Sequence, residues 1–176
     1  MKKAISALAT PYTWPILPTL PPDFASPDAP WRISNLQTAH GCEPANVRLE
    51  LLAQCAPLIT DAVICGHDRD YLAALAWPDL AACCALAPEL AGLDTEALVQ
   101  HPLVVSVIRS RLLMASAGSA SMTVRRVLLM SEPPSMEANE IADKGYINQA
   151  ACRARRSGLV EVLYQTEPAL NVACAQ

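Results

Sequence analysis

The sequence predicts an α+β domain in which helices pack on a small mixed or antiparallel β-sheet. Three observations support this fold class. Short, mainly apolar runs bounded by glycine, proline or polar residues occupy residues 58–66, 71–78 and 122–130, and such runs are typical of strands. Other segments, such as 102–116, place apolar side chains three or four residues apart, which is the spacing of one helix face. A chain of 176 residues that is 52% hydrophobic is long enough for one domain with its own core.

Order is expected to begin near residue 43 with a helix. The stretch EPANVRLELLAQCAPL places Val47, Leu51 and Leu52 on one face at helical spacing. Pro57 follows this stretch and is expected to end the helix because proline cannot donate a backbone hydrogen bond.

The next two apolar runs predict an antiparallel hairpin. Residues 58–66 and 71–78 are short and opposed, and the polar link 67–70 (HDRD) joins them. This link contains a histidine beside acidic residues, but consecutive residues do not face one another, so we interpret it as turn chemistry. The other histidines, His40 and His101, have no identifiable catalytic partner in the sequence.

Helices are expected between this hairpin and the third strand. Pro78 and Asp79 suit the first turn of a helix over PDLAACCALA, and Asp94 suits the N-cap of a second helix over DTEALVQ. A third helix over 102–116 carries its apolar stripe at positions 104, 105, 108, 112 and 113. The segment 116–121, SAGSAS, is expected to be a flexible connector to the strand that follows.

A last helix is predicted over residues 146–164, after the extended turn SEPPS. The side chains expected to face inward are Ile147, Leu159, Val162 and Leu163. Three arginines are interpreted as its solvated face: Arg153, Arg155 and Arg156. A sheet covered by packed helices follows from this order of elements.

Three segments are expected along the chain. Residues 1–42 form a proline-rich lead segment that is expected to be disordered or to be the remnant of a hinge, since seven of the 15 prolines lie within 1–30. Residues 43–165 form the domain, and residues 166–176 form a tail.

Composition argues against several functional classes. The net charge of -4 and the low aromatic content of 5% argue against a nucleic-acid partner. The most apolar window, 71–93, is interrupted by prolines and acidic residues before it reaches the ~20 apolar residues that a membrane span needs. The seven cysteines include no C-x-x-C pair, so we expect reduced thiols, no metal site, no disulfide and a cytoplasmic location.

One basic residue stands apart from the others. The chain has three lysines, Lys2, Lys3 and Lys144, and its other positively charged side chains are arginines. Lys144 is therefore the only lysine after residue 3. It lies between Asp143 and Gly145 on the loop that precedes the last predicted helix. A lysine ammonium is a compact charge on a long flexible stem, suited to reaching a phosphate or carboxylate. From composition alone, a solvated loop lysine remains the alternative.

We expect the Lys144 loop to be exposed and free to move. Glu140 and Asp143 are near in sequence, but a surface pairing with either would be worth at most ~1 kcal/mol and could be broken when a partner docks.

The stretch EIADKGYINQ resembles the C-terminal lysine motif of AMP-forming acyl-CoA synthetases, in the form found in feruloyl-CoA synthases. Three further stretches extend the resemblance over most of the C-terminal lid domain, residues 43–165: LITDAVICGHDRDYLAALAWPDLAAC, VRRVLLMSEPPS and RARRSGLVEVLY. The lysine motif is shared across this adenylate-forming superfamily. The GHDRDY and EPPS stretches point more narrowly to the feruloyl-CoA group.

The resemblance implies that Lys144 is a catalytic residue. In such enzymes the corresponding lysine reaches into the ATP site of a large N-terminal domain and bridges the substrate carboxylate and the α-phosphate, where it stabilises crowded negative charge. The lid then rotates and helps to build the coenzyme A channel. ATP, Mg²⁺ and coenzyme A would be bound mainly by the N-terminal adenylation domain, and none is expected on this chain alone.

The large domain is not recognisable in residues 1–42, and WRISNLQTAHGCEPAN contains no hinge aspartate or lysine. Three functions are therefore open. The chain is the lid-domain fragment of an aromatic acyl-CoA ligase and inactive by itself, or one subunit of a split ligase, or a non-catalytic binding or regulatory module. In a split ligase, an apolar patch near Lys144 would be the docking surface for the separate large domain.

Overall fold

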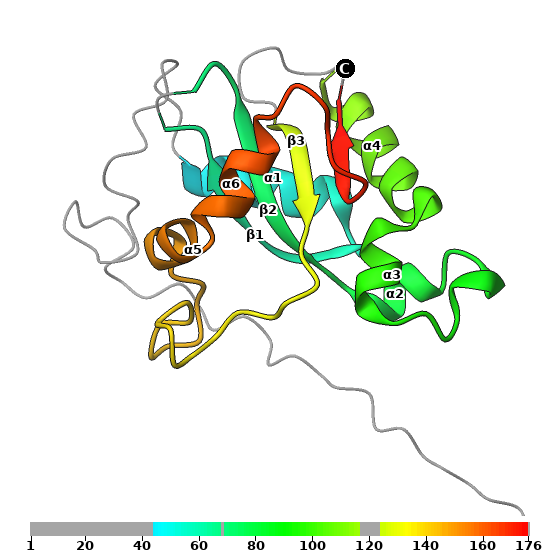
Figure 1. Cartoon of the computed structure of the whole chain (residues 1–176), viewed down its shortest axis with the longest axis horizontal. Helices are drawn as coiled ribbons and strands as arrows, with labels where there is room; N and C mark the ends of the chain where they lie inside the picture. Colours follow the sequence, from blue (N-terminus) through cyan, green and yellow to red (C-terminus); the bar gives the residue numbers. More distant parts are fainter. Residues whose placement is uncertain (1–43, 68, 117–123, 176) are drawn as a thin grey trace, which may run out of the picture. The chain divides into compact units, whose positions relative to one another are not determined.

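The computed structural model describes residues 44–67, 69–116 and 124–175 (Figure 1). Its elements, in chain order, are α1 (Pro44–Cys55), β1 (Ile59–Cys65), β2 (Leu72–Pro78), α2 (Leu80–Cys84), the 3₁₀ helix η2 (Pro88–Leu90), α3 (Thr95–Gln100), α4 (Pro102–Ser116), β3 (Val124–Leu129), α5 (Gln149–Arg155), α6 (Ser157–Leu163) and β4 (Val172–Cys174).

The four strands form one sheet in the order β1-β2-β3-β4. β1 and β2 pair antiparallel, with Ala62 opposite Ala76, so the hairpin predicted from residues 58–66 and 71–78 is confirmed. β3 lies parallel to β2. Parallel neighbours need a crossover connection, and α2, η2, α3 and α4 supply it. The sheet is therefore mixed and carries helices, which confirms the predicted α+β class.

The fourth strand lies in the segment that the sequence assigns to a tail, residues 166–176. β4 pairs antiparallel with β3, with Ala173 opposite Val127. Asn171 extends this pairing, because the Leu129 N–H donates to its carbonyl at 2.9 Å and its side-chain amide donates back to the Leu129 carbonyl at 2.9 Å. A three-residue strand is too short to show the alternation that sequence patterns depend on.

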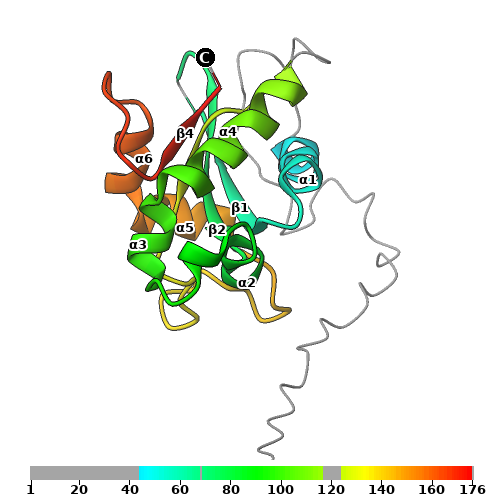
Figure 2. The same cartoon turned by 90° about the vertical axis from the view of Figure 1, so that its right-hand side faces the viewer.

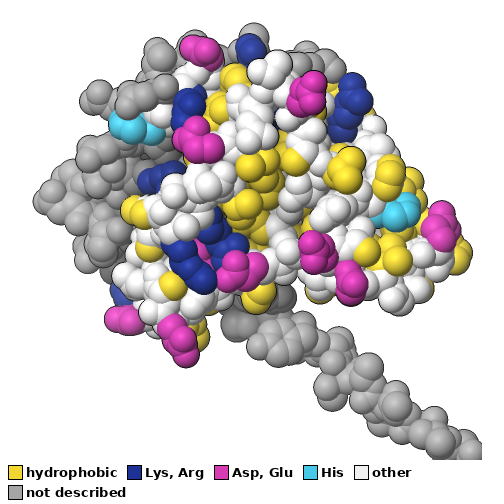
Figure 3. Space-filling model, viewed as in Figure 1, with side chains coloured by type: hydrophobic (Ala, Val, Ile, Leu, Met, Phe, Trp, Pro, Cys, Tyr) yellow, Lys and Arg dark blue, Asp and Glu magenta, His cyan; other side chains and the backbone are white. Residues whose placement is uncertain are grey.

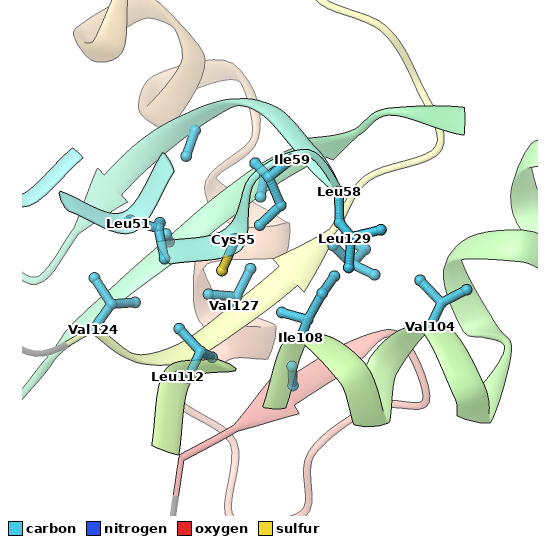
Figure 4. Close-up of a cluster of buried hydrophobic side chains, with 14 of the residues drawn as sticks. Leu51, Cys55, Leu58, Ile59, Val104, Ile108, Leu112, Val124, Val127 and Leu129 are labelled. Atoms are coloured by element: carbon cyan, nitrogen blue, oxygen red, sulfur yellow. The ribbon is translucent and has the colours of Figure 1, made fainter. Parts of the chain in front are cut away.

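One face of the sheet is covered by α1 and α4 and is apolar (Figures 2 and 4). Alternate strand residues project to this face: Ala62, Ile64, Ala74, Ala76, Val127, Leu129 and Ala173. Each helix presents residues four apart, which are Val47, Leu51 and Cys55 from α1 and Val104, Ile108 and Leu112 from α4. Of the other positions predicted for these stripes, Leu52 and Val105 are half-buried and Leu113 is exposed.

The opposite face carries α5 and α6 (Figure 2). The strand residues that alternate with those of the first face, together with Met130 after β3, pack here against Cys152 of α5 and Leu163 of α6. This second cluster contains Val63, Cys65, Ala73, Leu75, Trp77, Leu128, Met130, Cys152, Leu163 and Val172. Since successive strand residues point to opposite faces, both sides of the sheet are buried and the domain has three layers.

Two helices replace the single helix predicted over residues 146–164. α5 ends and α6 begins at Arg156, whose φ of -96° and ψ of 26° are not helical. The prediction that Arg153, Arg155 and Arg156 form one solvated face is wrong for Arg156, which is 5% exposed, and Arg153 is half-buried. Of the predicted inward side chains, Leu163 is buried and the other three, Ile147, Leu159 and Val162, are half-buried.

Two short helices, α2 and α3, begin with an aspartate N-cap. The Asp94 carboxylate accepts from the Ala97 N–H at 2.8 Å, which confirms the predicted N-cap of α3. Asp79 does the same for α2 through the Ala82 N–H at 2.8 Å, but Pro78 ends β2 and does not belong to the first turn of that helix.

The described cysteines are all free thiols, namely Cys55, Cys65, Cys83, Cys84, Cys152 and Cys174. Burial raises the pKa of the Cys65 thiol to about 12, which leaves little thiolate to react or to bind a metal. In the described ranges no helix is both long and apolar enough to cross a membrane. The expectations for residues 1–42, for Asp68 and for all but the first residue of the 116–121 connector lie outside the described residues.

Candidate functional site: the Lys144 hairpin

Lys144 lies at the tip of a tight β-hairpin between β3 and α5, which Figure 1 shows as the yellow-to-orange segment below α5. Three backbone hydrogen bonds close this hairpin. The Asn148 N–H donates to the Glu140 carbonyl at 2.8 Å, the Ala142 N–H to the Tyr146 carbonyl at 2.8 Å, and the Gly145 N–H to the Ala142 carbonyl at 2.7 Å. A single antiparallel bridge between Ile141 and Ile147 completes the pairing. We call residues 140–148 the lysine hairpin.

The three-residue tip has the hydrogen-bond pattern of a turn followed by a left-handed bulge residue. Gly145 supplies that residue with a φ of 81°, a value that a side chain beyond hydrogen makes costly. Lys144 immediately precedes this glycine and is exposed. The sequence therefore explains the tip, because the small residue that follows the lysine is the one that lets the chain turn.

Within the part of the chain that the structure describes, the Lys144 ammonium makes no ion pair. The exposed, unpaired lysine is as expected. The expectation of a loop that moves freely is not supported, because the backbone on both sides of the lysine is paired. The reach of Lys144 comes from its own side chain and not from an open loop.

Glu140, the first residue of the lysine hairpin, is completely buried at 0% exposure. Its Oε1 accepts from the Arg156 Nε at 2.7 Å, and its Oε2 accepts from the Arg156 Nη2 at 2.9 Å. Oε2 also accepts from the Arg155 Nη1 at 2.9 Å and from the Ser135 N–H at 2.8 Å. This two-point contact with Arg156 is the bidentate geometry of a strong carboxylate–guanidinium pair. The carboxylate is therefore not available to Lys144.

The Arg156 hydrogen bonds hold the pKa of the Glu140 carboxyl at about 2 against an ordinary value of 4.5, although burial alone would raise it. Arg156 reaches further into the domain: its Nη2 donates to the Pro133 carbonyl at 2.9 Å and its guanidinium lies 5.4 Å from the centre of the Trp77 ring. Figure 3 shows basic and acidic side chains side by side on this face of the molecule.

The other end of the lysine hairpin passes directly into α5. The Asn148 side chain caps this helix by accepting from the Ala151 N–H at 3.2 Å. The next residue, Gln149, accepts from the Ile64 N–H at 3.0 Å and donates to the Ala62 carbonyl at 2.8 Å. These two contacts imitate the pairing of a neighbouring strand. Gln149 thus joins the hairpin to β1.

Two other polar positions singled out in the sequence, Arg69 and His101, have structural contacts. Arg69, in the turn between β1 and β2, pairs with Glu161 and lies 4.7 Å from the centre of the Tyr164 ring. His101 is the C-cap of α3 and accepts from the Leu103 N–H at 3.3 Å. His40 lies outside the described residues. In the described ranges, no group of three or more histidine, cysteine or acidic residues could hold a metal ion.

The sequence singles out Lys144 as a candidate but not the residues that bond its hairpin to the rest of the domain. The sequence presents Glu140 only as a weak surface partner of the lysine, and its helix pattern places Arg156 in solvent. The apolar pattern does not single out Gln149. The one available signal is that its amide side chain directly follows the helix cap Asn148.

A comparison with protein-family models finds no match, and neither does a comparison with curated proteins. Solved structures do match. The A-PCP didomain of carboxylic acid reductase from Segniliparus rugosus, solved in complex with AMP, is 18% identical with a TM-score of 0.54 and matches 73% of this chain. The A domain of the same enzyme, solved with AMP and a co-purified carboxylic acid, is 17% identical with a TM-score of 0.53 and matches 70% of this chain.

These matches show a shared fold. The chain covers only 17% and 18% of those two structures, so it corresponds in fold to a small part of each.

Proposed function

We propose that the described domain is the mobile C-terminal domain of an AMP-forming acyl-CoA ligase and that Lys144 is its adenylation lysine. The observation that carries this proposal is the exposed, unpaired ammonium at the tip of a closed hairpin. The fold likeness to part of an AMP-bound A domain supports an adenylate-forming enzyme in general. The lysine's role rests on the EIADKGYINQ motif.

The reaction is acyl adenylate formation. A carboxylate oxygen of the acid attacks the α-phosphorus of ATP, the bond from that phosphorus to the bridging oxygen breaks, and pyrophosphate leaves. Negative charge gathers where the carboxylate meets the phosphate. A positioned ammonium between them lowers the barrier, by drawing the two anions together and by stabilising the charge of the transition state.

In this proposal a second domain binds the substrates of the reaction. Among the described residues no metal cluster is present, and the residues of the lysine hairpin could contribute one cation toward a bound nucleotide. ATP, Mg²⁺, the acid and coenzyme A would be held mainly by a large N-terminal adenylation domain, in the same chain or in a separate one. Exposed Met136 and Tyr146 lie on either side of Lys144 in the sequence and would give such a partner apolar contacts.

The finer assignment is to the feruloyl-CoA group, with a hydroxycinnamate as the acid. It rests on the GHDRDY and EPPS stretches.

Pyrophosphate exchange with ferulate tests the proposal. The chain by itself should show no exchange, and addition of a large domain from a feruloyl-CoA synthase should restore it. Lys144→Ala should reduce the restored rate by about 100-fold or more, the loss expected when a transition-state charge contact is removed. Lys144→Arg should also fail, because the guanidinium is planar and larger.

Glu161→Gln serves as the matched control, since it removes one charge from an exposed pair on α6. Equal exchange by wild type and Lys144→Ala, in a mixture where wild type restores activity, would refute the catalytic role. The domain would then be better explained as a binding module.

A further inference from the structure

The lysine hairpin is attached to the rest of the domain at both of its ends, through side chains that the adenylation chemistry does not use. Glu140 ties the first end to the α5–α6 junction, and Gln149 ties the second end to the edge of β1. A hairpin fixed at one end could pivot, whereas one fixed at both ends keeps its orientation.

We propose that Glu140 and Gln149 are positioning residues for Lys144. They hold the lysine hairpin fixed on the domain, so that the lysine approaches an anionic target only when the whole domain moves. The identity of that target rests on the proposed function, whereas the attachment of the hairpin does not.

Charge balance gives Glu140 a second effect in the same role. Arg155 and Arg156 both donate to its carboxylate, and Glu132 pairs with them from the solvent side. Two arginines are thus matched by two carboxylates. Because carboxylates engage the guanidinium groups of Arg155 and Arg156, these two arginines compete less with Lys144 for an incoming carboxylate or phosphate.

Amide hydrogen exchange on the isolated chain tests the attachment directly. The Ala142, Gly145 and Asn148 amides each donate a hydrogen bond inside the hairpin. Gln149→Ala and Glu140→Gln should each speed exchange at these three amides by about tenfold, while β2 amides stay slow, because only the hairpin opens.

Glu132→Gln is the matched control. It removes a carboxylate from the same arginine cluster, but the Glu132 side chain is 62% exposed and forms no bond with the hairpin. Its hairpin amides should exchange as in wild type. Glu140→Gln removes the main counter-charge of a buried arginine and can destabilise the whole domain. If Glu140→Gln does not fold, Gln149→Ala, at a half-buried position, decides the test.

Kinetics separate positioning from simple structural support. With the large domain supplied, Gln149→Ala should lower kcat for adenylation by about tenfold and leave KM for ATP unchanged, since a misplaced group costs rate and not nucleotide binding. Gln149→Glu, which keeps an acceptor oxygen for the Ile64 N–H, should recover part of the lost rate.

Unchanged hairpin exchange in Gln149→Ala would overturn the attachment, whatever the activity. Faster exchange with unchanged kcat would overturn the positioning role. A hairpin that opens as expected, in a mixture where Lys144→Ala is as active as wild type, would instead refute the proposed function and leave the attachment standing.

Discussion

The two faces of the sheet are built in different ways. The face under α1 and α4 is closed by aliphatic side chains and buried cysteines, spaced four residues apart on each helix. The face under α5 and α6 has an apolar cluster too, but it also contains the buried charges of Glu140 and Arg156. The lysine hairpin is attached to this second face.

The difference separates stability from function. An apolar face loses stability in proportion to the side chain removed and is indifferent to pH. A buried ion pair adds little net stability over apolar packing. Removal of one partner nevertheless destabilises the fold strongly, because the other charge is left buried and unpaired. In the positioning role proposed above, the Glu140–Arg156 pair contributes orientation of the hairpin that carries Lys144 and not net stability.

The largest effect is expected on the apolar face. Ile108→Ala should lower the free energy of unfolding by about 3 to 4 kcal/mol, the cost of a cavity in a closed core, and the loss should be the same at pH 7 and pH 3. Leu113→Ala, on the same helix but 40% exposed, should cost well under half as much. Urea unfolding at both pH values measures this. A strong pH dependence of the Ile108→Ala loss would contradict the contrast between the faces.

The second face should respond to acid. The Glu140 pKa is about 2 in the folded domain against an ordinary 4.5. Its pairing with Arg155 and Arg156, which also face Glu132, therefore stabilises the fold fully above pH 4.5. A contribution of about 3 kcal/mol should be lost as the pH falls from 4.5 to 2.

Urea unfolding of wild type and Glu140→Gln tests this acid response. The stability gap between the two proteins should narrow by about 2 kcal/mol between pH 7 and pH 3, because the amide that replaces the carboxylate cannot be protonated in this range. A constant gap would show that the carboxylate is not held ionised by its partners.

The helix caps on the two faces give a smaller and matched comparison. Asn148→Ala and Asp94→Ala should each cost about 1 kcal/mol of unfolding free energy, because each leaves a first-turn N–H without its acceptor. Only Asn148→Ala should also speed amide exchange in the lysine hairpin. Faster hairpin exchange in Asp94→Ala would mean that the two faces are not independent.

The smallest effect on stability is expected at Lys144 itself. Lys144→Ala should change the free energy of unfolding by less than about 0.5 kcal/mol, as is usual for an exposed side chain without a partner. Thermal unfolding checks this. A loss above about 1 kcal/mol would imply a structural contact for the lysine and would weaken its assignment to chemistry.

Local patterns predict most of the apolar framework and little of the polar one. The hairpin of β1 and β2 and the helix over 102–116 follow from runs and spacings within about fifteen residues. Arg156 looks solvated in the sequence because its partner Glu140 is 16 residues away, across a turn that no periodicity describes. The break between α5 and α6 is missed for the same reason, because it occurs at Arg156, the residue whose side chain enters the domain.

The sequence singles out the candidate lysine but not the residues that attach its hairpin to the domain. Lys144 stands out in the sequence through its residue type and through the EIADKGYINQ motif that contains it. Gln149 does not, because its role depends on two backbone groups of β1 about 85 residues earlier. Such contacts arise only once the strands have been placed side by side.

The contacts of Gln149 also bear on self-association. β1 is the outer strand of the sheet, and an open outer strand is a template on which another molecule can add. Here the outward groups of Ala62 and Ile64 are bonded by side chains of the same chain: two by Gln149, the Ile64 carbonyl by Arg153 at 3.2 Å, and the Ala62 N–H by Asp61 at 2.6 Å. Gln149 therefore occupies two of the β1 backbone groups on which a strand of another molecule would have to pair.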